Sequence, residues 1–212
     1  KKQRERAREK TGEVDPSDGR STMRFGDQVT GDYLLQRRNE VKNEAFIADH
    51  PGSKAAIVLW DMGTDCLFIA PTATRSEPET RKAMTDFIGP TDEVRSFYSD
   101  NAAELKKAAR SLEYCHPTST PGCADTNGLA EGKVKLGKSG TRGQLIHSGF
   151  HKSWWPKAAV VYADNHTFTP SVRWPTDPKE SPYERRLKVK FKGVMFALGQ
   201  LVDFMTTPFP CN

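Results

Sequence analysis

The segment that most constrains the fold is residues 55–60, an unbroken apolar run with the sequence AAIVLW. A strand with one face in water alternates apolar and polar residues, whereas a run without polar residues is typical of a strand buried on both faces. Such a strand needs packing layers above and below it. We therefore expect residues 55–60 to lie inside a sheet that is covered on both sides.

Strand-like and helix-like segments alternate along much of the chain. Three strand-like runs come first and form a meander, and helical apolar spacing then alternates with short extended segments. This order predicts an α/β fold with a mixed five-stranded sheet flanked by helices. The predicted strands are residues 29–35, 55–60, 66–70, 94–98 and 114–117, and the predicted helices are residues 76–88, 102–112, a helix from near Asn127, and 154–165.

Composition divides the chain into three parts. Residues 1–22 are polar and rich in Lys and Arg, and we expect a disordered basic arm. Residues 23–168 hold the predicted core, and residues 169–212 form a Pro-rich linker with a C-terminal extension. The net charge of +5 permits a polyanionic partner such as DNA. No apolar run approaches the ~20 residues that cross a bilayer, and without an initiator Met the sequence can be a piece of a longer protein.

Two acidic residues lie at strand positions where a site could form. Asp32 lies within the first predicted strand, and Asp100 follows the fourth. Glu131 comes near the start of a helix, just after a Pro- and Gly-rich loop. Carboxylates brought together repel one another, and a bound divalent cation such as Mg²⁺ or Mn²⁺ removes that penalty. The spacing alone is weak evidence, because the chain holds 27 acidic residues.

The local sequence around these carboxylates resembles the integrase core of copia-type retrotransposons. The resemblance covers roughly residues 24–204, and its motifs occur in the family's order. It rests on FGDQVTGD at residues 25–32, YSDNAAEL at 98–105, HPTSTP at 116–121, TNGLAE at 126–131, SWW at 153–155 and SPYERR at 181–186.

The resemblance implies a ribonuclease H-like fold and a retrotransposon integrase catalytic core. Asp32 and Asp100 would hold one Mg²⁺ or Mn²⁺ ion, and Asp32 with Glu131 a second. The reaction would be processing of DNA 3′ ends followed by strand transfer into target DNA. It further implies DNA and further copies of the chain as partners, and action in the nucleus. No membrane partner is expected.

Other residues would support this site. Asn101 and Asn127 are candidate supporting residues beside Asp100 and ahead of Glu131. Lys135 and Lys138 follow Glu131 at i+4 and i+7, so a helix places all three on one face. There the two lysines are expected to contact DNA phosphates. The predicted DNA-binding residues are Lys133, Lys135, Lys138 and Arg142. Asp61 is the alternative first carboxylate, but Asp32 fits the first-strand context better.

The sequence also departs from the family pattern. Gly132 stands where the family usually has Arg, and Gly137, Gly140 and Gly143 follow in the same predicted helix. Each Gly costs ~1 kcal/mol in a helix interior relative to Ala. The separation of Asp100 from Glu131 is shorter than in many members. Scattered Cys and His residues cannot supply the HHCC zinc module that precedes most integrase cores.

Two alternatives therefore stand beside the enzyme. A catalytically decayed, integrase-derived DNA-binding or structural module would tolerate the glycine-rich helix. A structure-selective nuclease of the same fold would share the carboxylates but would leave the residues after 150 unexplained.

Overall fold

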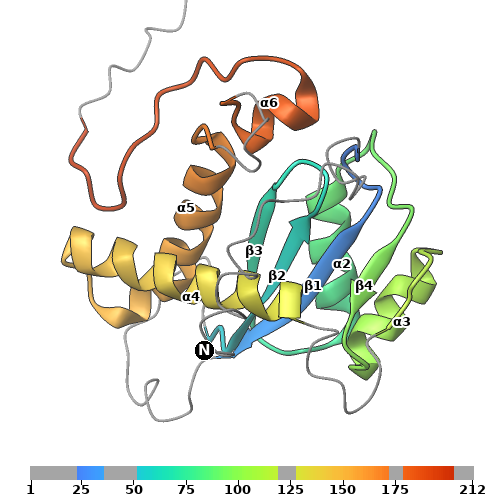
Figure 1. Cartoon of the computed structure of the whole chain (residues 1–212). Coiled ribbons are helices and arrows are strands. Elements are labelled where there is room, and N and C mark those ends of the chain that lie inside the picture. The colour runs from blue at the N-terminus through green and yellow to red at the C-terminus, as the bar shows by residue number, and fades with distance from the viewer. Residues whose placement is uncertain (1–22, 36–51, 119–127, 172–178, 203–212) are drawn as a thin grey trace, which may run out of the picture.

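The structure, a computed structural model, describes residues 23–35, 52–118, 128–171 and 179–202 (Figure 1). The predicted basic arm over residues 1–22 lies outside the described residues, and so does Asn127. Within the described ranges, strands β1–β4 form one sheet, with α2 and α3 on one side and α4 and α5 on the other (Figure 1).

The sheet has four strands in the order β3-β2-β1-β4. β1 (Val29–Leu35), β2 (Ala55–Asp61) and β3 (Leu67–Thr72) form the predicted antiparallel meander. The short strand β4 (Phe97–Ser99) pairs with β1 in parallel, which makes the sheet mixed. The mixed α/β architecture predicted from the sequence is therefore confirmed.

The prediction of five strands is wrong for the part of the chain that the structure describes. The fifth segment is reduced to two isolated parallel bridges, Ser96 to Cys115 and Ser99 to Thr118. The Phe97 N–H donates to the Cys115 carbonyl over 2.8 Å. Pro117, between the two bridges, has no N–H to donate, and a proline interrupts a hydrogen-bonded ladder. The segment lies in register but does not become a strand.

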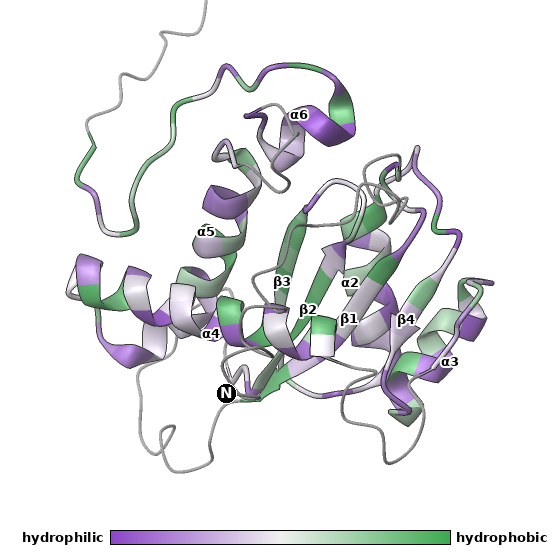
Figure 2. Ribbon diagram, viewed as in Figure 1, coloured by the Kyte–Doolittle hydropathy of each residue, from purple (hydrophilic) through white to green (hydrophobic). Residues whose placement is uncertain are grey.

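Two hydrophobic clusters form the core, one on each face of the sheet. Every residue of β2 is buried, as the run at 55–60 predicted. Ile57 and Leu59 of β2 pack with α2 (Glu77–Ile88) and α3 (Ala103–Ser111). Val58 and Trp60 pack with α4 (Gly128–Ser148) and α5 (Trp155–Phe168). Figure 2 shows the resulting concentration of apolar residues on the strands.

The remaining described elements are short. The 3-10 turn η5 (Lys152–Trp154) leads into α5. Helix α6 (Pro182–Leu187) begins at a capping box in which the Ser181 and Glu184 side chains each accept from the other's backbone N–H. Part of the predicted Pro-rich linker, residues 172–178, lies outside the described residues. No helix within the described ranges has the length and hydropathy needed to cross a membrane.

Candidate active site

Asp32 lies in the middle of β1, half-buried between buried neighbours. Alternate residues of a strand share a face, so the Asp32 side chain belongs to the same face as Leu34, which packs in the cluster with α4 and α5. Gly31 precedes it, and a Cβ there would lie 2.8 Å from Leu59 and 3.0 Å from Phe97. The missing side chain therefore leaves room for Leu59 and Phe97 on the face of the sheet that α2 and α3 cover, opposite the face of Asp32.

Asp100 is brought beside Asp32 by the strand register. Gly31 of β1 pairs with Ser99, the last residue of β4, in parallel, so a predicted carboxylate follows each of them: Asp32 within β1 and Asp100 directly after β4. One Asp100 carboxylate oxygen accepts from the Ala102 N–H over 3.0 Å. This bond closes a turn that ends β4 and fixes the Asp100 side chain at the carboxyl end of the strand.

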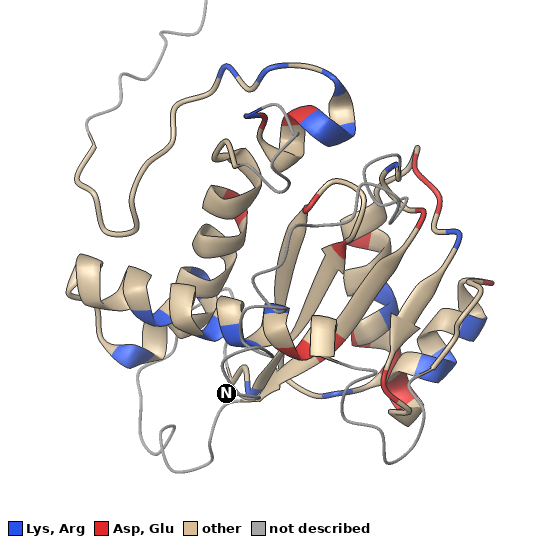
Figure 3. Ribbon diagram, viewed as in Figure 1, with Lys and Arg blue, Asp and Glu red and all other residues tan. Residues whose placement is uncertain are grey.

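Glu131 lies in the first turn of α4, the helix that passes over the β1 side of the sheet (Figure 1). Its side chain is 48% exposed and lies 3.8 Å from the Lys135 ammonium. Glu131 is the one acidic residue of α4, and basic residues follow it along the helix (Figure 3). Glu131 is the most exposed of the three predicted carboxylates and the least constrained by hydrogen bonds among those described.

The charges of the three carboxylates act on one another. Burial raises the pKa of Asp32 above its ordinary value, and the negative charges of Asp100 and Glu131 raise it further. The Tyr33 N–H, which donates to Asp32 over 2.6 Å, and the Arg75 guanidinium oppose this rise. A carboxyl that burial and two like charges disfavour in its ionised form is a good ligand for a divalent cation, whose charge offsets the repulsion.

The side chains are nevertheless not gathered into a preformed metal site. Within the described ranges, no group of three or more His, Cys, Asp or Glu side chains is arranged to hold an ion. Asp32 lies within β1 and Asp100 directly after β4, whereas Glu131 acts on Asp32 from α4. Carboxylate oxygens are the donors that Mg²⁺ and Mn²⁺ prefer.

Asp61, the alternative first carboxylate, has a structural role. It is fully buried, so it cannot contact a substrate. One oxygen accepts from the Gly26 N–H over 2.9 Å, and the other accepts from the N–H and hydroxyl of Thr64, each over 2.7 Å. These bonds tie the end of β2 to the turn before β1, which leaves Asp32 as the first-strand candidate.

The basic residues of α4 divide into two groups. Lys135, with a side chain that is 78% exposed, Lys138 and Arg142 are exposed to solvent. Their contact with DNA stays a prediction. Lys133 turns inward instead: its ammonium lies 2.8 Å from Asp65 and 4.1 Å from the centre of the Trp60 ring. Its charge is therefore paired inside the protein, a placement that the DNA-binding prediction did not anticipate.

This inward pair belongs to a cluster that anchors α4. Asp65 accepts from the Trp60 indole N–H over 2.7 Å and lies 3.5 Å from the His166 ring on α5. Burial alone would raise the pKa of Asp65, but His166 and Lys133 together hold it well below its usual range. The cluster joins the β2–β3 turn to α4 two residues after Glu131, and so helps to hold the helix that carries the third carboxylate.

The glycines of α4 do not break the helix, which is continuous over 21 residues. Packing favours glycine most at Gly140, where a Cβ would lie about 2.1 Å from the Tyr162 ring; a Cβ at Gly137 would lie 3.0 Å from the end of the Ile69 side chain, which would have to shift slightly. Gly132 and Gly143 face open space, and nothing in the structure requires glycine at either position. Close packing therefore excludes a side chain at Gly140 and disfavours one at Gly137, but it does not explain the other glycines of α4.

Two further residues near the carboxylates were not assigned a role from the sequence. Arg75 influences Asp32, lies over the Tyr33 ring at 4.8 Å and donates to Glu104 over 2.7 Å. His116 contacts the Ser99 hydroxyl over 2.8 Å, next to Asp100. Only the fold brings them to the site. Asn101 is exposed and follows Asp100 directly, while Asn127 lies outside the described residues.

Comparisons with solved structures identify the fold. The magnesium-bound HTLV-2 integrase catalytic core domain, in its trimeric form, matches with a TM-score of 0.56 and 13% identity over 77% of this chain and 98% of that chain. The dimeric form matches with a TM-score of 0.52, 12% identity, and 77% and 97% coverage. A chain of the simian T-cell lymphotropic virus intasome in complex with PP2A regulatory subunit B56 gamma matches with a TM-score of 0.59 and 14% identity.

That third match covers 87% of this chain and 61% of the intasome chain. No protein-family model and no curated protein matches the sequence. At these identities the similarity concerns architecture. The chain has the fold of retroviral integrase catalytic cores.

Proposed function

We propose that the chain is the catalytic core of a copia-type retrotransposon integrase, a divalent-metal-dependent polynucleotidyl transferase. One observation carries the proposal above all: on an integrase-core fold, the register of β1 and β4 sets Asp32 beside Asp100, and the charge of Glu131 reaches Asp32 from α4. The sequence motifs around the same three residues supply the copia-type assignment.

Asp32 and Asp100 would hold one Mg²⁺ or Mn²⁺ ion, and Asp32 with Glu131 a second. Two ions so held would activate an attacking oxygen and stabilise the leaving oxygen. Asp32 is the shared ligand in this arrangement, in keeping with the charges of Asp100 and Glu131 that both act on it. Glu131 completes the site only when its side chain turns inward, away from Lys135.

The proposed reaction has two balanced steps at phosphorus. Water would first attack the phosphorus of a phosphodiester near the DNA end and displace the 3′ oxygen of the strand. This frees a 3′-hydroxyl, and the terminal nucleotides leave with a 5′-phosphate. That hydroxyl then attacks a target phosphodiester, so that a new P–O bond forms and the bond to the target's own 3′ oxygen breaks. Lys135, Lys138 and Arg142 would bind DNA phosphates along α4, while Asp32 stays fixed in β1 and Asp100 directly after β4.

The partners and the place of action belong to the same proposal. The substrates would be the ends of the retrotransposon DNA and the target DNA, the working form would be a homo-oligomer, and integration would take place in the nucleus. The solved structures of trimeric and dimeric HTLV-2 cores and of a simian intasome support an assembly of this kind for the fold.

A second candidate function is a decayed integrase core that binds DNA without acting on it. The exposed position of Glu131 and the open surroundings of Gly132 beside it favour this alternative. A helix that is weak at its first turn would hold the third carboxylate poorly, and misplacement by ~1 Å can cost about 10²-fold in rate.

A strand-transfer assay with Mn²⁺ and a labelled DNA end separates the two functions. The wild-type chain should join the labelled end to target DNA, and Asp100→Asn should abolish the product without weakening DNA binding. Asp86→Asn, at an exposed carboxylate on α2, is the matched control and should keep full activity. A wild-type chain that binds DNA yet gives no product would support the decayed module, and equal activity in Asp100→Asn would remove Asp100 from the site.

A further inference from the structure

His116 begins the HPTSTP segment, a motif between the second and third carboxylates that the proposed mechanism leaves without a role. Isolated bridges on either side of it, at Cys115 and Thr118, join this segment to β4 and to the residue before β4. The His116 ring packs on the buried Phe97 ring, with 5.3 Å between the ring centres and 30° between the planes. The backbone and the ring of His116 are therefore both held against β4.

Two hydrogen bonds in series connect the His116 ring to the backbone of Asp100. The Nε2 atom of His116 lies 2.8 Å from the Ser99 hydroxyl oxygen, and that hydroxyl donates to the Asp100 carbonyl over 2.9 Å. A carbonyl oxygen can only accept, so the single hydrogen of the hydroxyl is used there. Nε2 must then carry a hydrogen and donate it to Ser99. Burial and the Lys106 charge lower the pKa of His116 against the opposite effect of Asp100, which favours a neutral ring with this one tautomer.

Asp100 depends on such bonds because β4 ends one residue before it. Its carboxylate accepts from the Ala102 N–H over 3.0 Å, and its carbonyl accepts from Ser99, so the side chain and the main chain of Asp100 are each fixed. Ser99 is fully buried, and water cannot replace His116 as its donor. The His116 N–H thus holds the Ser99 hydroxyl in place, and hydrogen bonds in series strengthen one another.

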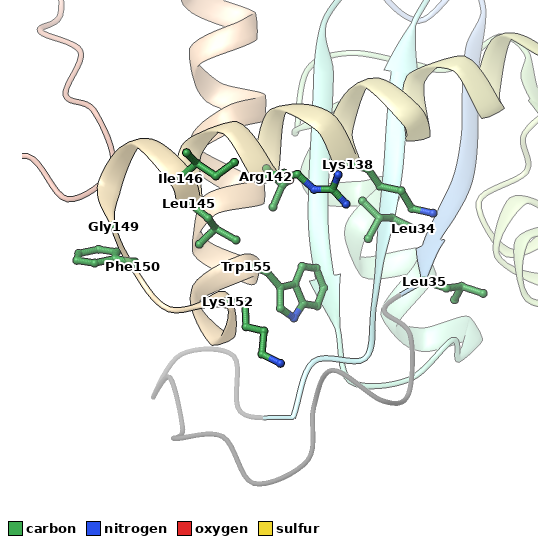
Figure 4. Close-up of a pocket in the computed structure, with 11 residues that line it drawn as sticks. Leu34, Leu35, Lys138, Arg142, Leu145, Ile146, Gly149, Phe150, Lys152 and Trp155 are labelled. Carbon is green, nitrogen blue, oxygen red and sulfur yellow. The ribbon is translucent and has the colours of Figure 1, made fainter.

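The His116 ring lies on the face of the sheet opposite to Asp32. Phe97 belongs to the cluster with α2 and α3, and Ser99, two residues further along β4, shares its face. Asp32 shares the other face with Leu34, which lines the cavity under the second half of α4 (Figure 4). His116 is therefore placed to orient Asp100 from behind the strand.

We propose that His116 is a positioning residue of the active site, which holds Asp100 in place for a divalent cation through the Ser99 hydroxyl. This inference rests on the proposed function, because it takes Asp100 to be a metal ligand. Replacement of a residue that orients a metal ligand typically lowers metal affinity or activity about 10- to 100-fold. His116 acts through one intermediate side chain, so we expect an effect near the lower value.

The hydrogen-bond chain can be tested without metal, from long-range ¹H–¹⁵N NMR spectra of the histidine ring nitrogens. We expect the His116 ring to carry its hydrogen on Nε2, the atom that faces Ser99. A hydrogen on Nδ1 would reverse the bond to Ser99 and remove the donor that the Asp100 carbonyl needs. That result would overturn the inference.

Binding of Mn²⁺, followed through the electron paramagnetic resonance signal of the free ion, tests the positioning role. His116→Phe keeps a ring against Phe97 but removes the donor, and should weaken binding about tenfold. His116→Gln, which keeps an N–H, should bind like the wild type. Ser99→Ala should show the same loss as His116→Phe, and the double variant should lose no more than either single variant. His147→Phe, at an exposed histidine of α4, is the matched control and should change nothing.

The outcomes keep this inference separate from the proposed function. If Asp100→Asn binds Mn²⁺ like the wild type, Asp100 is no metal ligand and both proposals fall. If Asp100→Asn loses the ion but His116→Phe and Ser99→Ala keep it, the integrase proposal stands and the inference is overturned. This holds even if the two variants lower the free energy of unfolding. A loss in His116→Phe without one in Ser99→Ala would also overturn it, because His116 would then act on the ion directly.

Discussion

Replacement of glycine by alanine in α4 should have opposite effects on the free energy of unfolding at an exposed glycine and at a closely packed one. Gly143 is exposed, and an added Cβ would meet nothing within 4 Å. Gly143→Ala should therefore gain the full difference in helix propensity, about 1 kcal/mol. At Gly140 the added Cβ would lie 2.1–2.2 Å from three atoms of the Tyr162 ring, where unstrained contacts do not fall below 3.0 Å.

For Gly140→Ala the helix gain of about 1 kcal/mol is set against an overpacking cost of ~1–3 kcal/mol. Tyr162 is held against the cluster between α4, α5 and the sheet and cannot move away without loss of contact. The net effect should be destabilisation of up to about 2 kcal/mol, and the two variants should differ by roughly 1–3 kcal/mol in free energy of unfolding.

Urea unfolding followed by circular dichroism measures this difference. With a slope near ~2 kcal/mol/M, Gly143→Ala should raise the midpoint by about 0.5 M and Gly140→Ala should lower or barely change it. A Gly140→Ala variant that is as stable as Gly143→Ala would refute the close approach of α4 and α5. A destabilised Gly143→Ala would refute the open surroundings of Gly143.

Three further expectations follow from the ionisable groups. Lys133→Ala should lower the free energy of unfolding by about 2 kcal/mol at pH 7, less than the ~3–5 kcal/mol of a fully buried pair because the Lys133 side chain is 21% exposed. The pKa of Asp65 is depressed, so its stabilisation is present above the unfolded value near ~4 and is lost as the pH falls through the folded value. The difference in free energy of unfolding between the wild type and Lys133→Ala should accordingly become smaller as the pH is lowered. A difference that does not depend on pH would argue against the Asp65 pair. The pKa of Asp32 is raised, so its contribution to stability is lost as the pH rises through the folded value, and metal-free Asp32→Asn should melt above the wild type at pH 7. Burial raises the pKa of the Cys66 thiol to about 11, so mass spectrometry after alkylation at pH 8 should find Cys66 unlabelled in the folded protein; rapid labelling there would contradict its burial.

The sheet and the helices that cover both of its faces could be predicted from the sequence, because a strand buried on both faces has an apolar sequence throughout. Every residue of 55–60 is apolar, and β2 is buried throughout. Asp32 and Asp100 were found through strand patterns and motifs, and the β1–β4 register then set them side by side. Local propensity predicted a fifth strand over residues 114–117, but the segment forms only two isolated bridges. Pro117 lies between these bridges and interrupts the hydrogen-bonded ladder.

The behaviour of α4 was harder to predict because it depends on residues far away in the chain. The number of glycines in α4 predicts a low helix propensity. The residues that pack against two of these glycines, Ile69 and Tyr162, can be identified only from the fold. The inward position of the Lys133 side chain could have been predicted from helical spacing. Lys133 follows Glu131 by two residues and so lies on nearly the opposite side of the helix, whereas Lys135 and Lys138 return to the face of Glu131.

The central claim is that the third carboxylate completes a transferase site, and Glu131→Gln tests it most directly. Strand-transfer product would be measured with Mn²⁺ for the wild type, for Glu131→Gln and for Glu93→Gln, an exposed control outside the site. We expect product from the wild type and from Glu93→Gln, and a loss of at least about 10²-fold in Glu131→Gln. Equal product from Glu131→Gln, or none from the wild type, would contradict the claim.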